Sequence, residues 1–404
     1  MKIVSLGIGL AVGLVLIAKV YFEQSYDDFY PDRDRVYQVW AKYQQNGGEL
    51  KDYPQTSGGI APTMQQQIPE IETVTRYTSF GDWTFTMTDT KMKYSGRCII
   101  ADSCFFDILP RPMLIGNAKE VLSTPMYVLV SSRIAKNIGG DVIGKNFTVD
   151  SSPGRTMTIG GVFEEVPENS HSRYDVIVSM ASAGRFMWEG SPTNMLGNDR
   201  YISYVKLHKG VNPLALEEQV HTFVNSYFPP EEQQKTGFNI GFSFHELDGL
   251  HKELPQVKRM TWILSLLAFA LIFTAGVDYI LIVISSIVNR SKEVAVHKCY
   301  GASENNIHGM MFGEALVHIV LSLILALLLI LAFRGTVEEL LATSLDSLLL
   351  SNGSLVLLGI CILVFFVSGF MRDHYTLGFR WPPLSVITGR ISVSGRKPCC
   401  LSSL

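Results

Sequence analysis

The residues from Met260 to Val288, MTWILSLLAFALIFTAGVDYILIVISSIV, form an apolar run with a single charged side chain, Asp278. An α-helix needs about 20 predominantly apolar residues to cross the hydrocarbon core of a bilayer. The run is too long and too apolar for an amphipathic helix on a soluble protein, and Lys258 and Arg259 stand directly before it. It therefore predicts a transmembrane helix over 259–289.

Three further apolar runs predict three more spans, at 1–22, 310–333 and 355–371. In the first run the uncharged part ends at Ala18, so Lys19 is expected to reach the membrane interface with its long side chain. A cleaved signal peptide is the competing interpretation. The single basic residue at the start and the lack of a small-residue cleavage site favour a membrane anchor. The sequence thus predicts an α-helical membrane protein with four transmembrane helices.

The composition of the 404 residues, 47 % hydrophobic and 18 % charged with a formal net charge of −3, resembles that of a soluble protein. This average is misleading, because the apolar residues are bunched at the N-terminus and in the last third of the chain. The apolar content excludes a disordered chain. The mild acidity gives no electrostatic reason to expect a nucleic-acid partner, and the apolar runs predict contact with membrane lipid.

Lysine and arginine in the short loops predict the orientation of the spans. The loop 290–309 and the tail 372–404 are rich in basic residues, whereas the loop 334–354 carries only Arg334 against three acidic residues. We therefore expect the loop 290–309, the tail and both termini in the cytoplasm, and the loop 334–354 outside. The large block 23–258 then lies outside as well.

The external block, 23–258, is long enough to bury a hydrophobic core. Two similar β-α-β patterns, at about 30–80 and about 200–250, predict α+β halves with helices on one face of a sheet. Pro69 ends the first helix, because proline disfavours the α region in the residue before it. The middle, about 81–198, shows short strands between Gly, Pro and Ser turns, which predicts a β-rich insertion. The expected elements are strands at 35–43, 71–79, 156–163, 175–179, 201–208 and 239–247, and helices at 61–68 and 213–227.

The sequence contains none of the catalytic motifs GxSxG, HExxH or the phosphate-binding P-loop. His171 lies in a polar turn after a predicted strand and is interpreted as loop structure, and His245 and His251 as surface or packing residues. Cys98 and Cys104 lie in the external block, where a disulfide is allowed, and either a bridge or two free thiols fits the sequence. We therefore expect a chain that is not an enzyme and holds no metal or other cofactor.

Two features stand out inside the predicted spans. A carboxylate such as Asp278 is expensive in a membrane and usually faces protein or water. Packing within the helix bundle is the favoured interpretation, and a proton or substrate pathway is the alternative. Gly9 and Gly13 have the GxxxG spacing, which permits close packing of helices.

The loop after the second span, from Asn289 to Ser303, reads NRSKEVAVHKCYGAS. Gly301 fits the position just after the end of a helix. Ser303 fits the N-cap of the next helix, with Glu304 in its first turn. The spacing leaves two interpretations open: an amphipathic connector on the inner leaflet, or a docking helix for a cytoplasmic partner.

Residues 292–303 closely resemble the segment K-E-(I/V)-(G/A)-(I/V)-(R/H)-K-x-x-G-A-S of MacB/FtsX-type ABC transporter permeases. Four places in the external block resemble the periplasmic core domain of that family in their order and spacing. They are Ser25–Phe29 with Asp34–Tyr37, Phe105–Phe106, Val128–Ser131 with Gly144–Lys145, and Thr158–Phe163 leading into Val166–His171. Together these segments extend the resemblance over most of the chain.

The resemblance implies that this chain is a permease subunit whose partner is a separate cytoplasmic ABC ATPase. The ATPase holds the ATP and Mg²⁺, and the permease subunit works with a second permease copy or half. It assigns contact with the ATPase to Arg290, Lys292, Glu293, Val294, Val296, His297, Lys298, Tyr300, Gly301, Ala302 and Ser303. It also implies mechanotransmission, in which the first two membrane helices relay ATP-driven movement of this coupling segment to the periplasmic domain.

Two functions fit this resemblance. The first is export of an antimicrobial peptide, drug or lipid-linked substrate from the inner membrane, with a periplasmic adaptor or outer-membrane channel as a further partner. The second is an FtsX-like transmitter that transports nothing and activates a cell-wall hydrolase or a sensor. Relatives usually have an amphipathic helix before the first span, and many have a second copy of the whole unit. We therefore expect this chain to be one half of a transporter or a fragment of one.

Overall fold

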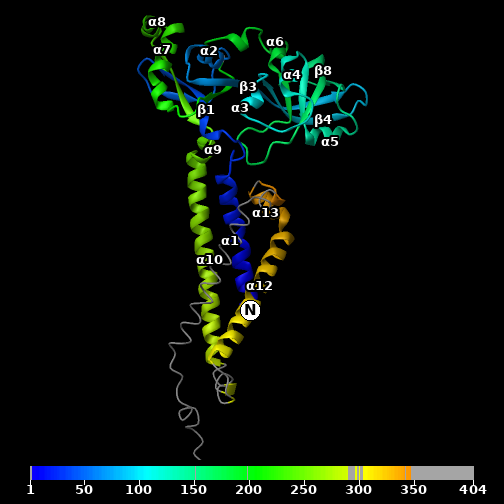
Figure 1. The fold of residues 1–404 in the computed structure, drawn as a ribbon, viewed down its shortest axis with the longest axis vertical. Coiled ribbons are helices and arrows are strands. Elements are labelled where there is room, and N and C mark those ends of the chain that lie inside the picture. Colours follow the sequence, from blue (N-terminus) through cyan, green and yellow to red (C-terminus); the bar gives the residue numbers. More distant parts are fainter. Residues whose placement is uncertain are drawn as a thin grey trace, which may run out of the picture. The chain divides into compact units, whose positions relative to one another are not determined.

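The computed structural model describes residues 2–150, 152–197, 199–289, 296–297, 300, 304–341 and 343–346. The chain forms two compact units. The helical unit contains Met1–Lys19 and Ile263–Leu404, and the sheet domain contains Val20–Trp262. Helices α1 (Lys2–Gln24) and α10 (Pro255–Asn289) contribute residues to both units and are drawn in blue and yellow-green in Figure 1.

Two helices are long and apolar enough to cross a membrane, namely Ile3–Gln24 and Pro255–Asp278. They support the first two predicted spans. A bent pair, Leu316–Ala332 and Arg334–Leu341, passes the same test only when its two helices are counted together, which makes up to three spans. The fourth predicted span, 355–371, lies outside the described residues.

The third predicted span differs from the structure in its shape. Helix α12 (Glu304–Ala332) begins before the expected boundary at 310, and a 72° bend separates its last part, Leu316–Ala332, from helix α13 (Arg334–Leu341). The start of the predicted loop 334–354 is therefore helical. The hydropathy of the sequence marked the apolar length correctly, but it carries no information on a change of helix direction.

Close packing of α1 within the helical unit depends on two glycines. A Cβ atom added to Gly9 would lie 2.6 Å from the Cβ of Ala275, and one added to Gly13 would lie 2.7 Å from Cγ1 of Ile272. Both neighbours belong to α10, and neither distance is tolerable for a real methyl group. The close helix packing predicted from the GxxxG spacing is thus confirmed.

Lys19, which the sequence predicts to reach the membrane interface, has hydrogen-bonding partners within the helical unit. Its side chain is buried, with 8 % exposed, and its ammonium group donates to the carbonyl oxygen of Leu341 at 2.7 Å and to Oγ1 of Thr343 at 3.0 Å. Burial of a charge requires hydrogen-bonding partners of this kind. Both acceptors are more than 300 residues away in the sequence, so the length of the apolar run could not reveal them.

Asp278 has an exposed side chain among the described residues of the helical unit. Its packing within a bundle stays a prediction, because the fourth predicted span, 355–371, lies outside the described residues.

The sheet domain is built on one 11-stranded sheet in the order β11-β1-β10-β3-β4-β9-β6-β8-β5, with β2 beside β1 and β7 beside β3 and β8. The strands are β1 (Val36–Gln45), β2 (Lys51–Tyr53), β3 (Ile71–Met87), β4 (Lys93–Ala101), β5 (Met113–Ile115), β6 (Tyr127–Ser131), β7 (Asn146–Val149), β8 (Ser152–Phe163), β9 (Val176–Ser179), β10 (Ile202–Leu207) and β11 (Phe238–Glu246). The α-helices of this domain are α2 (Ile60–Gln67), α3 (Phe105–Ile108), α4 (Ala118–Ser123), α5 (Ser132–Ile138), α6 (Ala183–Phe186), α7 (Glu217–Tyr227), α8 (Pro230–Thr236) and α9 (Gly249–Lys252).

One end of the sheet consists of two interlocked β-α-β units. The first is β1-α2-β3 and the second is β10-α7-β11, and each unit leaves a gap that a strand of the other fills. The resulting order β11-β1-β10-β3 has antiparallel neighbours throughout, which is the ferredoxin-like arrangement. The predicted α+β class is confirmed.

Local sequence signals explain two helix boundaries here. Ile68, the residue before Pro69, is extended with φ −114° and ψ 100°, and α2 ends at Gln67 as the proline predicts. Helix α8 ends at Thr236, and the next residue, Gly237, has the left-handed φ of 64° that glycine adopts without strain.

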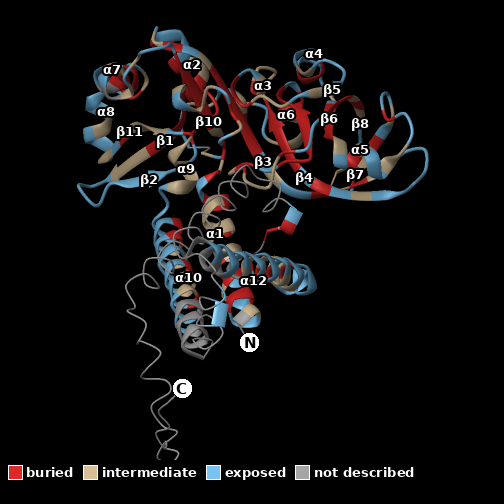
Figure 2. Ribbon diagram, turned by 60° about the horizontal axis from the view of Figure 1, so that its bottom comes forward, coloured by how far each residue is buried: buried red, intermediate tan, exposed pale blue. Residues whose placement is uncertain are grey.

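Strand β3 carries the sheet into the β-rich region. The first part of its 17 residues pairs with β10, and the second part pairs with β4 and β7. The strands of the predicted insertion, about 81–198, therefore extend the same sheet. Figure 2 shows β10 and the first part of β3 as largely buried.

Each half of the sheet has an apolar core. Under α2 and α7 the core includes Val39, Met64 and Phe223, each at most 1 % exposed, and in the β-rich half it includes Phe85 and Phe147. The amphipathic helices and alternating strands of the sequence place these side chains on inward faces.

Cys98 and Cys104 are free thiols in this structure. Burial raises the pKa of both thiols, and Cys98 is fully enclosed on β4. Of the two interpretations that the sequence left open, the structure supports the free thiols.

Candidate functional site

The coupling segment predicted from the sequence is described at three residues. Val296 and His297 are helical and exposed, and Tyr300 donates its backbone N–H to the carbonyl oxygen of Val296 at 3.1 Å, with 88 % of its side chain exposed. An exposed tyrosine and valine suit contact with a protein partner. The remaining predicted residues lie outside the described residues: Arg290, Lys292, Glu293, Val294, Lys298, Gly301, Ala302 and Ser303.

A second candidate site lies in the sheet domain, where α1 ends. Glu23 is only 5 % exposed, and its Oε2 lies 2.6 Å from Nε2 of His251 in α9. The ring of Tyr26 stacks on the same imidazole with 3.4 Å between ring centroids and 8° between ring planes. The last turn of α1 is thereby attached to the short helix that precedes α10.

The chain directly after α1 is held by the loop that follows β8. The backbone N–H of Asp27 donates to the carbonyl oxygen of Asn169 at 2.9 Å, and Nδ2 of Asn169 donates to the carbonyl oxygen of Ser25 at 2.7 Å. Oδ1 of Asp27 accepts from Oγ of Ser170 and from the backbone N–H of His171, both at 3.2 Å. The other carboxylate oxygen lies 2.8 Å from Nδ1 of His171, without the alignment of a hydrogen bond.

His171 connects this loop to the sheet. Its Nε2 lies 2.5 Å from the hydroxyl oxygen of Tyr204 on β10, and the hydroxyl of the neighbouring Ser172 donates to that of Tyr77 on β3 at 2.8 Å. Burial raises the pKa of Tyr204 and Tyr77, so both hydroxyls stay protonated at neutral pH. The chain of contacts from Asp27 therefore ends on two central strands of the sheet.

We call this set of residues the junction. It comprises Glu23, Ser25, Tyr26, Asp27, Asn169, Ser170, His171 and His251.

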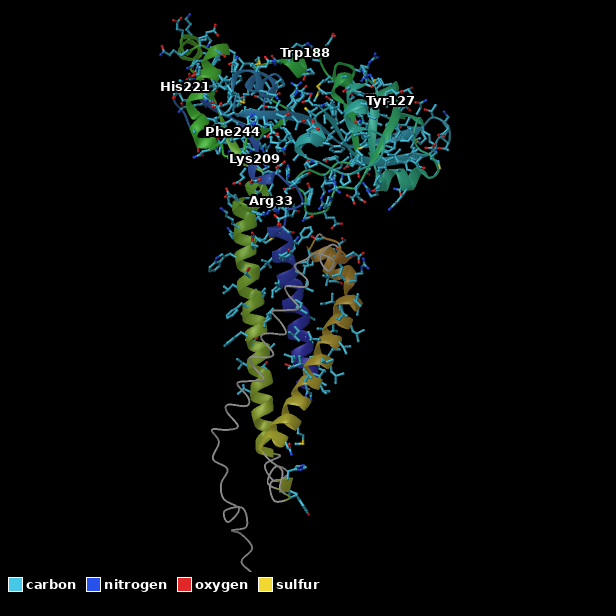
Figure 3. All side chains as sticks on the ribbon, viewed as in Figure 1. Arg33, Tyr127, Trp188, Lys209, His221 and Phe244 are labelled. Atoms are coloured by element: carbon cyan, nitrogen blue, oxygen red, sulfur yellow. The ribbon has the colours of Figure 1, made fainter. Side chains whose placement is uncertain are left out.

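Charged side chains surround the junction. Arg33 contacts Asp28 at 2.8 Å and Asp248 at 3.2 Å, and Lys252 contacts the same two carboxylates at 2.9 and 2.8 Å. Arg33 is labelled in Figure 3 close to the connection between α1 and β1. These pairs are partly exposed, so each contributes little to stability, but together they connect the segment after α1 with α9.

The geometry of the junction fits attachment of α1 to the sheet and to α9, and it does not fit catalysis. Asp27, His171 and Tyr204 are arranged in the order of a carboxylate, an imidazole and a hydroxyl, as in a catalytic relay. Tyr204, however, is 0 % exposed, so no substrate can reach its hydroxyl. Within the described part of the chain, no group of three or more His, Cys, Asp or Glu side chains is placed to hold a metal ion.

Part of the junction can be recognised in the sequence. Ser25–Phe29 and Val166–His171 are separate segments of one family resemblance, and the structure brings these two segments into contact. The interpretation of His171 as loop structure and of His251 as a surface or packing residue did not include their contacts with Asp27 and Glu23. For the contact between Asp27 and His171, the signal in the sequence was that each residue lies within a segment of the resemblance. Glu23, the partner of His251, lies outside these segments.

Comparison with known families gives two matches along the chain. Residues 1–223 match the family described as the MacB-like periplasmic core domain, and residues 265–375 match the FtsX-like permease C-terminal region. No match was found among proteins with curated functions.

Three solved structures resemble part of the chain. A domain named as that of a permease protein from Porphyromonas gingivalis is 32 % identical, with a TM-score of 0.49, and the match covers 54 % of this chain and 91 % of that one. The periplasmic region of MacB from Actinobacillus actinomycetemcomitans is 15 % identical, with a TM-score of 0.36 and coverage of 51 % and 87 %. The extracellular domain of the noncanonic ABC-type transporter YknZ from Gram-positive bacteria is 10 % identical, with a TM-score of 0.35 and coverage of 52 % and 98 %.

Proposed function

We propose a function from the premise that this chain belongs to the MacB/FtsX family of permeases, whose ATPase is a separate subunit. In this proposal the chain couples ATP hydrolysis by a cytoplasmic ABC ATPase to a conformational change of its sheet domain. The task is export of an antimicrobial peptide, drug or lipid-linked substrate. A second permease copy or half completes the transporter, and ATP and Mg²⁺ are bound by the ATPase.

The junction is the observation that carries this proposal. Glu23 at the end of α1 and His251 directly before α10 contact each other at 2.6 Å, and Asp27 is held by the loop at His171. Movement of either apolar helix along its axis would therefore pull on side chains that end on β3 and β10. A ligand can drive such a change only if it binds the two arrangements with different affinity, and ATP binding by the partner would supply that difference.

The topology belongs to the same proposal. The chain is a multi-pass protein of the inner membrane with four spans, the sheet domain is periplasmic, and both termini are cytoplasmic. The two apolar helices that bracket the sheet domain, Ile3–Gln24 and Pro255–Asp278, support this arrangement, as does the excess of basic residues in the loop 290–309 and the tail 372–404.

Nucleotide-dependent hydrogen exchange tests the coupling. The chain and its ATPase subunit are reconstituted in nanodiscs, and exchange is compared by mass spectrometry with ATP and with ADP. We expect the nucleotide to change exchange in peptides covering the junction, and Glu23→Gln to reduce that change, because the charged contact with His251 is lost. Glu49→Gln, at an exposed loop position, is the matched control. Equal exchange with both nucleotides while the ATPase turns over would refute coupling through the junction.

Charge inversion tests the coupling segment. We expect Glu293→Arg combined with Lys298→Glu to reduce co-purification of the ATPase subunit, because both changes invert charge at the proposed contact. The matched control is Glu231→Arg combined with Lys235→Glu, an exposed pair on α8 of the sheet domain. Undiminished co-purification of the double variant in detergent would contradict the assigned contact.

A second candidate function is an FtsX-like transmitter that activates a cell-wall hydrolase or a sensor. Strand β5 lies at the end of the sheet, and its Leu114 and Ile115 are 57 % and 50 % exposed. An exposed apolar edge strand offers a surface for a protein partner. Identification of the proteins that co-purify from native membranes separates the two functions: a hydrolase or sensor kinase favours transmission, and an adaptor or outer-membrane channel favours export.

A further inference from the structure

A cavity of about 700 Å³ opens in the sheet domain at the end of the sheet formed by β1, β2 and β11. Its walls come from these strands, from the C-terminal end of α7, from α8 and from the loop that contains Leu196 and Asp199. Figure 2 shows these helices and strands together in one half of the domain. The volume falls in the range of sites for small molecules, roughly 300–1,000 Å³.

Aromatic rings form much of the wall. The ring of Tyr43 is stacked on that of Phe238 with 5.3 Å between centroids, and it is tilted against that of Tyr53 with 5.6 Å between centroids. Phe228 and Ile240 are buried in the lining, whereas Tyr53 is 43 % exposed. The faces of aromatic rings carry negative charge density and attract cations. Three neighbouring rings around one space therefore provide an environment for a positive group.

A carboxylate lies in the same wall. Oδ2 of Asp199 accepts from the hydroxyl of Tyr43 at 2.5 Å, and Oδ1 accepts from the hydroxyl of Ser57 at 2.5 Å. Both donors are neutral, so they orient the carboxylate without cancelling its charge. Among the residues whose positions are described, the partners of the Asp199 carboxylate are these two hydroxyls, and it forms no ion pair with a lysine or arginine. The charge of Asp199 is thus fixed in position and available to a ligand.

Two tyrosines report the influence of this carboxylate. Burial, together with the hydrogen bond to Asp199, raises the pKa of Tyr43. Burial and the charge of Asp199 likewise raise the pKa of Tyr227, whose hydroxyl oxygen is buried without a hydrogen-bond partner in the described part of the chain.

We propose that this cavity binds a small organic cation, an ammonium group carried on an apolar body. The aromatic rings would enclose the ammonium group, and Asp199 would supply the opposite charge. A metal ion fits poorly, because a single carboxylate among apolar walls offers too few oxygen ligands. A neutral apolar ligand would desolvate the carboxylate without compensation, which is costly. This site does not depend on the proposed coupling to an ATPase.

Choline and its neutral isostere 3,3-dimethylbutan-1-ol test the proposal, because they have the same shape and differ in charge. Binding of each is measured by calorimetry to the full chain in a neutral maltoside detergent. We expect choline to bind at least tenfold more tightly than the alcohol. Equal affinity for the two probes, or no binding of choline, would overturn the proposal, and this comparison needs no variant that has to fold.

Variants then locate the site. Asp199→Asn keeps one acceptor oxygen and turns the other position into an amide NH2, which donates to the hydroxyl that it meets. We expect this variant to weaken choline binding at least tenfold and to leave binding of the alcohol unchanged. Tyr53→Leu removes one ring at an exposed position and should weaken choline binding severalfold. Asp52→Asn, an exposed carboxylate on β2 outside the lining, is the matched control. A loss as large in Asp52→Asn as in Asp199→Asn would overturn the assignment to this cavity.

Discussion

Replacement of Asp27 by asparagine isolates the contribution of charge to the junction. Asp27 is 0 % exposed and has a left-handed backbone with φ 60°. Asparagine tolerates this conformation about as well as aspartate does, so Asp27→Asn changes the charge and leaves the backbone and the side-chain volume almost unaltered. The neighbouring residue Asp28 provides a control, because its carboxylate is 40 % exposed.

The expected cost of Asp27→Asn follows from the contacts. Two hydrogen bonds to the carboxylate, from Ser170 and His171 at 3.2 Å each, become bonds to a neutral oxygen, which costs about 1 kcal/mol apiece. The contact between the carboxylate and Nδ1 of His171 at 2.8 Å is also lost as a charged contact. We expect a total of about 3 kcal/mol from the weakening of these two hydrogen bonds and of the close contact at a buried carboxylate.

Thermal unfolding of the full chain in detergent, followed by tyrosine and tryptophan fluorescence, measures this cost. For a domain of this size, about 3 kcal/mol corresponds to a fall in the unfolding midpoint of roughly 6–12 °C. Asp28→Asn breaks only partly exposed pairs with Arg33 and Lys252 and should lower the midpoint by about 4 °C at most. Equal shifts for Asp27→Asn and Asp28→Asn would refute the reasoning, since burial would then make no difference.

Two further predictions concern other contacts. Gly9→Val should destabilise the helical unit by about 1–3 kcal/mol, because the valine side chain has no room beside Ala275. A Cβ atom added at Gly276 meets nothing within 4 Å among the described residues, so Gly276→Ala should stabilise α10 by roughly 0.5–1 kcal/mol. The thermal unfolding midpoints of the two variants in detergent should therefore move in opposite directions. Hydrogen bonds from Lys206 and Arg35 lower the pKa of Asp32 from 3.8 to about 2, so its stabilising effect is present above pH 3.8 and is lost as the pH falls to about 2. The difference in urea midpoint between the wild type and Asp32→Asn should accordingly shrink over that interval, and a difference that stays constant would contradict the assigned cause.

Elements with strong local signals could be predicted from the sequence. The alternating runs at 35–43 and 201–208 appear as β1 and β10, and the helix expected at 61–68 appears as α2. In each case the deciding information lies within about ten residues: the period of the apolar positions, and a proline or glycine at the boundary. The apolar length of the first two membrane helices is a local signal of the same kind.

The pairing of these elements could not be predicted, because it depends on contacts between distant residues. Both β-α-β patterns were visible in the sequence, but nothing in either showed that β10 would enter between β1 and β3. The length of β3 was underestimated for the same reason. Its second part, beyond 79, is a strand because it pairs with β4 and β7, and Gly81 and Asp82 give a weak strand signal by themselves.

The junction shows most directly what a sequence hides. Asp27 and His171 are 144 residues apart, and the local sequence around each of them indicates only an ordinary polar residue in a turn. Their contact requires the whole sheet to be in place, because β10 and β3 supply the tyrosines behind His171. A buried carboxylate held by hydrogen bonds adds only modest net stability, but the protein is strongly destabilised when the partners of the carboxylate are displaced. Such a contact discriminates between correct and incorrect positions of the segment after α1, and the proposed coupling would depend on this sensitivity to position.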